Sequence, residues 1–142
     1  KYPGDGAFTL VNGVINTKGM ARSSEFLGFE GTGCEAIIDL GKEDTIHSVQ
    51  IDVLDQKESW IWPPASMNVL YSSDGVNFTE IPNAEGTKAY PDEVIRNIKW
   101  DYYPPFKTRY VKVVIKNYGI IPDGQPGAGN RSWLFVDEIE IN

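Results

Sequence analysis

The final strand-like segment of the chain, SWLFVDEIEIN (132–142), carries three carboxylates among apolar residues. Asp137, Glu138 and Glu140 could form a solvated strand face, a catalytic carboxylate pair or part of a metal site. A glycosidase needs two carboxylates that face each other across a cleft. Asp137 and Glu138 are neighbours and point to opposite faces of a strand, so they cannot form such a pair together. The solvated face and the metal site stay open.

Nucleophilic catalysis has few candidate residues in this chain. A serine or cysteine mechanism needs a base, and the sequence contains one histidine, His47, and one cysteine, Cys34. His47 shares strand parity with Val49 and Ile51, so we expect it at the edge of the core with its nitrogens satisfied. We expect Cys34 to pack as a small apolar residue. The sequence therefore predicts that this domain is not an enzyme.

Oxygen ligands make calcium the metal to consider. Zinc would need several cysteines and histidines, whereas calcium takes oxygen atoms and usually finds them in a loop. The segment TLVNGVINTKG (9–19) offers Asn12, Asn16 and Thr17 around a turn. The alternative is an ordinary Asn-Gly turn with exposed polar tips.

Aromatic residues gather in segments that lack strand character. ESWIWPP (58–64) contains Trp60, and GAGNRSW (127–133) contains Arg131 and Trp133. Flat aromatic faces suit stacking on sugar rings, and the guanidinium of Arg131 offers a planar fork of donors for paired hydroxyls. We predict a weak sugar site made by Trp60, Arg131 and Trp133 at one end of the molecule. The alternative is that Trp133 plugs the core and Arg131 joins an ion pair.

The elements that must position these residues are short strands. Fourteen glycines and nine prolines divide the chain into runs in which apolar and polar residues alternate, and Asp74-Gly75 suits a hairpin turn. This pattern predicts one all-β domain over residues 1–142, an antiparallel β-sandwich or jelly roll. The predicted strands are EAIIDLG (35–41), IHSVQIDVL (46–54), SMNVLYS (66–72), EVIRNIKW (93–100), RYVKVVIKN (109–117) and WLFVDEIEI (133–141).

Charge and hydropathy exclude two classes of partner. The formal net charge is −7, from 20 acidic and 13 basic residues, whereas binding to nucleic acid needs clustered cations. No apolar run reaches the roughly 20 residues that span a bilayer, so we expect no membrane span. The chain begins at Lys1, and we expect it to be part of a larger protein.

Several motifs together resemble a known family. IDLG (38–41), SSDGVNF (72–78) and WLFVDEIEI (133–141) are similar to the F5/8 type C, or discoidin, family with its galactose-binding-like jelly roll. The tail NYGIIPDGQPGAGNRSWLFVDEI (117–139) resembles the C-terminal domain of bacterial, Bacteroides-type family 20 β-N-acetylhexosaminidases, or chitobiases.

The resemblance implies a non-catalytic domain similar to family 32 carbohydrate-binding modules. Its expected partners are a glycan, of GlcNAc or galactose type, and the catalytic domain of a parent glycoside hydrolase. The expected location is periplasmic, outer-membrane-associated or extracellular. The alternative is a structural domain that packs on the catalytic domain and binds no sugar.

The resemblance also implies a structural calcium ion. Asn12 stands where the family usually has aspartate, Thr17 matches a hydroxyl ligand, and Glu138 matches the acid at the start of the last strand. Glu140 is then expected to be simply solvated. Galactose-binding members carry an arginine and an asparagine after the strand that matches 46–54, and DQKESWIW (55–62) has neither.

Overall fold

The computed structural model describes residues 27–81 and 95–142. These residues form strands and one short 3₁₀ turn, and no helix among them is long and apolar enough to cross a membrane. The elements are β1 (Leu27–Glu30), β2 (Cys34–Leu54), the 3₁₀ turn η2 (Lys57–Ser59), β3 (Ser66–Ser72), β4 (Thr79–Glu80), β5 (Ile95–Lys116) and β6 (Trp133–Ile141). The hydrogen-bonded strand order is β1-β6-β2-β5-β3-β4, and every pairing is antiparallel.

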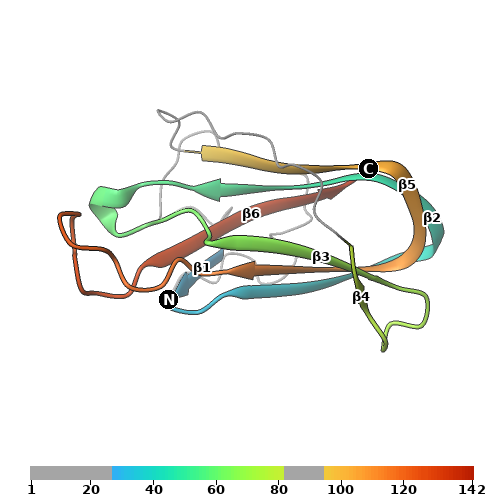
Figure 1. The fold of residues 1–142 in the computed structure, drawn as a ribbon, viewed down its shortest axis with the longest axis horizontal. Helices are drawn as coiled ribbons and strands as arrows, with labels where there is room; N and C mark the ends of the chain where they lie inside the picture. The colour runs from blue at the N-terminus through green and yellow to red at the C-terminus, as the bar shows by residue number, and fades with distance from the viewer. Residues whose placement is uncertain (1–26, 82–94) are drawn as a thin grey trace.

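Two long strands fold this sheet over on itself. β2 has 21 residues and β5 has 22, and they pair from Cys34↔Ile115 to Leu54↔Ile95. Both strands curve round at one end of the molecule (Figure 1). The first half of β2 therefore lies in one layer with the end of β5, β3 and β4, and its second half lies in the other layer with β6 and β1. The predicted antiparallel β-sandwich is confirmed.

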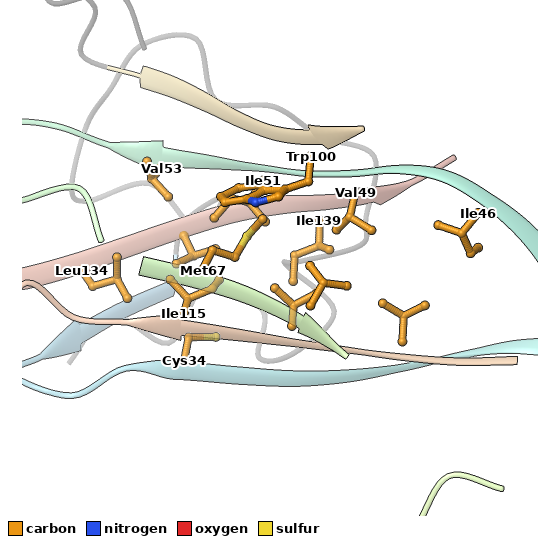
Figure 2. Close-up of a cluster of buried hydrophobic side chains, with 14 of the residues drawn as sticks. Cys34, Ile46, Val49, Ile51, Val53, Met67, Trp100, Ile115, Leu134 and Ile139 are labelled. Atoms are coloured by element: carbon orange, nitrogen blue, oxygen red, sulfur yellow. The ribbon is translucent and has the colours of Figure 1, made fainter. Parts of the chain in front are cut away.

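The core lies between these two layers. It is formed by the apolar residues that alternate with polar ones along each strand. Side chains from the two layers point toward one another, with Ile51 and Trp100 on one side and Ile115 and Cys34 on the other (Figure 2). The intervening residues of each strand face outward, as a period of two requires. The buried strand residues include Val49, Ile51, Val53, Val111, Val113 and Ile115, each at most 1 % exposed.

The expectation for His47 is wrong. His47 is exposed, whereas its neighbours Ile46 and Ser48 are both buried. The pairing of β2 with β5 shifts register between Ile46 and Ser48, at the bend where the strand passes from one layer to the other. Such an irregularity inserts a residue into the alternation, so parity counted back from Val49 fails there. Because β2 continues through this bend, the predicted strands 35–41 and 46–54 form one strand.

A second register shift explains the acidic segment of β6. Ile51 pairs with Ile139 but Val53 pairs with Val136, so one residue of β2 opposes two of β6. This two-against-one arrangement is a β-bulge, and it contains Asp137, which is 0 % exposed. The expectation that Glu140 is simply solvated is wrong, because Glu140 is partly buried and accepts a hydrogen bond from Gln50.

Candidate functional site

Two loops meet at the end of the sandwich opposite the bends. Residues 55–65 connect β2 to β3, and residues 117–132 connect β5 to β6 (Figure 1). We call this part of the molecule the loop end, and the curved part of β2 and β5 the bend end. The predicted residues Trp60 and Arg131 lie in these loops, and Trp133 begins the strand that follows.

The 3₁₀ turn η2 places Trp60 at the tip of the first loop. The turn ends at Trp60, whose N–H donates to the carbonyl of Lys57. Trp60 has φ 63°, a left-handed conformation that bulky residues seldom adopt. The base of the loop is closed by two hydrogen bonds between Gln56 and Ile61, 3.0 and 3.1 Å long. The indole of Trp60 is thus held by a constrained backbone and stays 39 % exposed.

Backbone hydrogen bonds bring Trp60 and Trp133 together. The N–H of Trp133 donates to the carbonyl of Trp60 at 2.8 Å, and the N–H of Trp62 donates to the carbonyl of Trp133 at 3.0 Å. The Trp133 side chain is half-buried, and its ring centroid lies 5.9 Å from that of Phe135. It packs against a small cluster that also contains Leu54 and Ile61. Trp133 therefore contributes mainly packing under the loop.

The ring of Trp60 lies directly over Gly127. A Cβ added to Gly127 would lie 2.2 Å from Nε1 of Trp60, which is far inside van der Waals contact. Gly127 also has φ 76°, so glycine is required here both by the backbone and by the ring above it. The second loop consequently forms a support for the indole.

The second loop is ordered by its own polar groups. The Asn117 side chain donates to the carbonyls of Phe29, Thr32 and Ser132, and its Oδ1 accepts from Gly119 N–H and from the Ser132 hydroxyl. Side chains that bond several backbone segments in this way fix a loop without regular structure. The loop end is therefore held in place before any ligand arrives.

Aromatic residues beyond the predicted set belong to the same region. The ring centroids of Trp62 and Tyr118 are 4.5 Å apart, and Lys57 Nζ lies 5.1 Å from the Trp62 ring while pairing with Asp55 at 2.9 Å. Tyr118 is 43 % exposed. Tyr118 is not among the predicted site residues. It directly follows the predicted strand 109–117, and an aromatic residue at the start of a loop is the signal that could have identified it.

Arg131 lies on a different flank of the second loop. Its side-chain methylenes cover Gly31, where an added Cβ would lie 2.7 Å from Cδ. Arg131 is exposed, and within residues 27–81 and 95–142 no carboxylate forms an ion pair with it. The structure thus joins Trp60 and Trp133 through the backbone but places the Arg131 side chain toward β1.

The predicted calcium ligands fall outside what can be described. Asn12 and Thr17 lie outside the described residues, and the side chain of Glu138 does too. Among the described residues, no group of three or more His, Cys, Asp or Glu side chains could hold a metal ion. The calcium site stays a prediction.

The cysteine behaves as predicted. Cys34 is 5 % exposed in the core, and burial together with the charge of Glu35 raises its pKa to about 11. A thiol that stays protonated at neutral pH is a poor nucleophile. Cys34 therefore acts as an apolar core residue.

Comparison with known proteins places this fold in a family. The family model of the F5/8 type C domain matches residues 21–134. The chain is similar to the family 32 carbohydrate-binding module (CBM32) of AlyQ in complex with 4,5-unsaturated mannuronic acid, with 15 % identity, a TM-score of 0.58 and coverage of 100 % of this chain and 89 % of that one. It is also similar to CBM32-1 from a family 31 glycoside hydrolase of Clostridium perfringens, with 19 % identity, a TM-score of 0.54 and coverage of 99 % and 89 %. No curated protein sequence matches the chain.

Proposed function

Because this chain belongs to the F5/8 type C family, we propose that it is a non-catalytic carbohydrate-binding domain with its sugar site at the loop end. Trp60 supplies the stacking surface, and Tyr118 and Arg131 lie at the flanks. The proposal extends to the type of parent protein, a secreted glycoside hydrolase of the family 20 β-N-acetylhexosaminidase kind. The relatives support a carbohydrate-binding role in a carbohydrate-active parent, since one is solved with a bound uronic acid and the other comes from a family 31 glycoside hydrolase. The family 20 parent rests on the resemblance of the tail 117–139 alone.

The observation that carries the proposal is the exposed ring of Trp60 on a fixed support. Folding normally buries large aromatic side chains, and exposing one on a constrained left-handed turn sacrifices apolar burial. The ring lies against Gly127, and the hydrogen bonds to Trp133 fix the backbone that carries it. A preorganised flat apolar face loses little conformational entropy when a sugar ring stacks on it.

The expected affinity is weak. One stacked ring and a few hydrogen bonds correspond to a millimolar dissociation constant, about −4 kcal/mol. Replacing Trp60 by alanine removes about 1 kcal/mol of stacking and thereby weakens binding roughly fivefold. The fold should persist because the indole is not part of the main core cluster.

The test is an NMR titration of the domain with a glycan panel that includes GlcNAc and galactose. The Trp60 indole N–H should shift with at least one glycan, and Trp60→Ala should weaken that binding. Tyr103→Ala is the matched control, because Tyr103 is 90 % exposed but lies at the bend end. If no glycan at tens of millimolar shifts any resonance, the domain is instead a structural contact domain of its parent protein.

We also propose a structural calcium ion held by Glu138, Asn12 and Thr17. The wholly buried Asp137 beside Glu138 supports it, because β6 there delivers acidic residues to a bulge facing the buried Asp52. Oxygen donors of this kind suit calcium. Calcium should raise the melting temperature, and Glu138→Gln should remove that increase while Glu140→Gln keeps it. An identical melting temperature in EDTA and in calcium would exclude the ion.

A further inference from the structure

The turn from β1 to β2 and the end of β5 both lie at the loop end (Figure 1). Residues of these two segments line a hollow. Its volume is about 440 Å³, which is large enough for a sugar residue. Gly31 and Gly33 form its wall, Val114 contributes an apolar surface, and Lys116 and Asn117 also line it. None of these residues is one of the aromatic residues exposed at the loop end, Trp60 and Tyr118, which we call the Trp60 surface.

Two glycines line this hollow, and neither position accepts a side chain. A Cβ on Gly33 would lie 2.4 Å from the backbone oxygen of Ile115, and backbone cannot move aside cheaply. Gly31 has φ 64°, and the Arg131 methylenes occupy the space beside it. The Gly31 N–H donates to the carbonyl of Ser132 at 2.9 Å and the Thr32 carbonyl accepts from the Asn117 side chain, so this turn is held in a fixed shape beside the hollow.

The cations near this hollow have no ion-pair partner among the described residues. Lys57, Arg109 and Lys112 pair with Asp55, Asp39 and Glu35 respectively. By contrast, Lys116, which lines the hollow, and Arg131, which covers Gly31, form no ion pair within the described part of the chain.

The one carboxylate that lines the hollow is already neutralised. Glu35 lies 2.7 Å from Lys112 Nζ. In a protein with a net charge of −7, an unpaired Lys116 in the lining and an unpaired Arg131 against Gly31 favour an anionic ligand group. A guanidinium and an ammonium together suit a carboxylate, which accepts hydrogen bonds from both.

A residue that lines the hollow is adjacent in sequence to an aromatic residue of the loop end. Asn117 lines the hollow, and the next residue, Tyr118, packs on Trp62. We propose that the hollow is a second subsite, which takes the carboxylate of a uronic acid residue in a glycan that also contacts the Trp60 surface. This proposal rests on the proposed carbohydrate-binding function and specifies its substrate class as an acidic oligosaccharide.

A comparison of tetrasaccharides that differ only at C6, with a carboxylate or a hydroxymethyl group there, tests whether the domain prefers a negatively charged glycan. Mannuronate, glucuronate and galacturonate tetrasaccharides are titrated against their neutral counterparts. At least one uronate should bind more tightly than its counterpart, and Lys116→Gln and Arg131→Gln should each reduce that preference by up to about fivefold, the upper range for an exposed charge pair. The preference should shrink as salt rises. Lys107→Gln, an exposed cation at the bend end, should keep it.

NMR separates this proposal from the function on which it rests. The Gly31 and Gly33 amides should shift with the uronate and not with its neutral counterpart. If glycans shift the Trp60 indole but leave both glycine amides unchanged, or if no uronate is preferred, the second subsite is overturned while the Trp60 site stands. If no glycan shifts any resonance, both proposals are overturned.

Discussion

Gly127→Ala should damage sugar binding without touching any sugar-contacting side chain. The new Cβ would lie 2.2 Å from Nε1 of Trp60 and about as close to two more ring atoms, at 2.5 Å each. Normal contact begins near 3.5 Å, so the indole must move by about 1 Å or more. A stacked ring that is displaced this far loses most of its contact with a ligand held by other groups.

The magnitude follows from two separate effects. Alanine at φ 76° costs about 1 kcal/mol of stability in the left-handed region. Displacing the indole loses about 1 kcal/mol of stacking, which weakens binding roughly fivefold. Gly129→Ala separates the two effects, because Gly129 has φ 86° in the same loop but nothing within 4 Å of an added Cβ.

The assay compares both variants by thermal unfolding and by glycan titration monitored through tryptophan fluorescence. Both should lose similar stability, but only Gly127→Ala should change the emission of Trp60 and weaken binding. Equal affinities in the two variants would refute the claim that the position of this ring determines binding.

Three further results are expected. Cys34, with a pKa of about 11 and little exposure, should react with a thiol reagent at pH 8 only in denaturant, and rapid reaction of the native domain would contradict its burial. Phe135→Ala should cost about 3–5 kcal/mol in urea unfolding, because Phe135 is fully buried against Leu54 and Ile61; a loss below 1 kcal/mol would show that the cluster is loosely packed. Hydrogen bonds from Asn77 and Val76 hold the pKa of Asp74 well below its usual range, so its contribution to stability is present above about pH 4 and is lost as pH falls through the lowered folded pKa. Asp74→Asn should flatten that part of the stability–pH curve, and an unchanged curve would contradict it.

The alternation of residues predicted the sandwich because strand faces are set by local parity. Val49, Ile51 and Val53 all face the core as expected. Parity failed at His47, where the chain bends between layers, and it shifts within β6, where the bulge lies between the core residues Val136 and Ile139. Both irregularities depend on how two distant strands pair, and a single strand's sequence does not contain that information.

The candidate site was predictable only in part. Exposed aromatic residues in loops could be recognised by composition, which found Trp60. The support under its ring could not, because it depends on Gly127, a residue 67 positions away, meeting the indole in space. The orientation of Arg131 over Gly31 is likewise a tertiary contact and has no local signature.

The continuous pairing of β2 with β5 around the bend end has an evolutionary consequence. Both ends of each long strand finish at the loop end, so the ladder that joins the layers is completed without any residue of 55–65 or 117–132. Substitutions at the exposed positions of these loops can change which ligand is recognised, while the ladder and the buried loop residues Ile61 and Ile121 keep the frame folded. Such a separation suits a domain that diversifies quickly, and it makes the exposed positions of these two loops the natural ones for a randomised library.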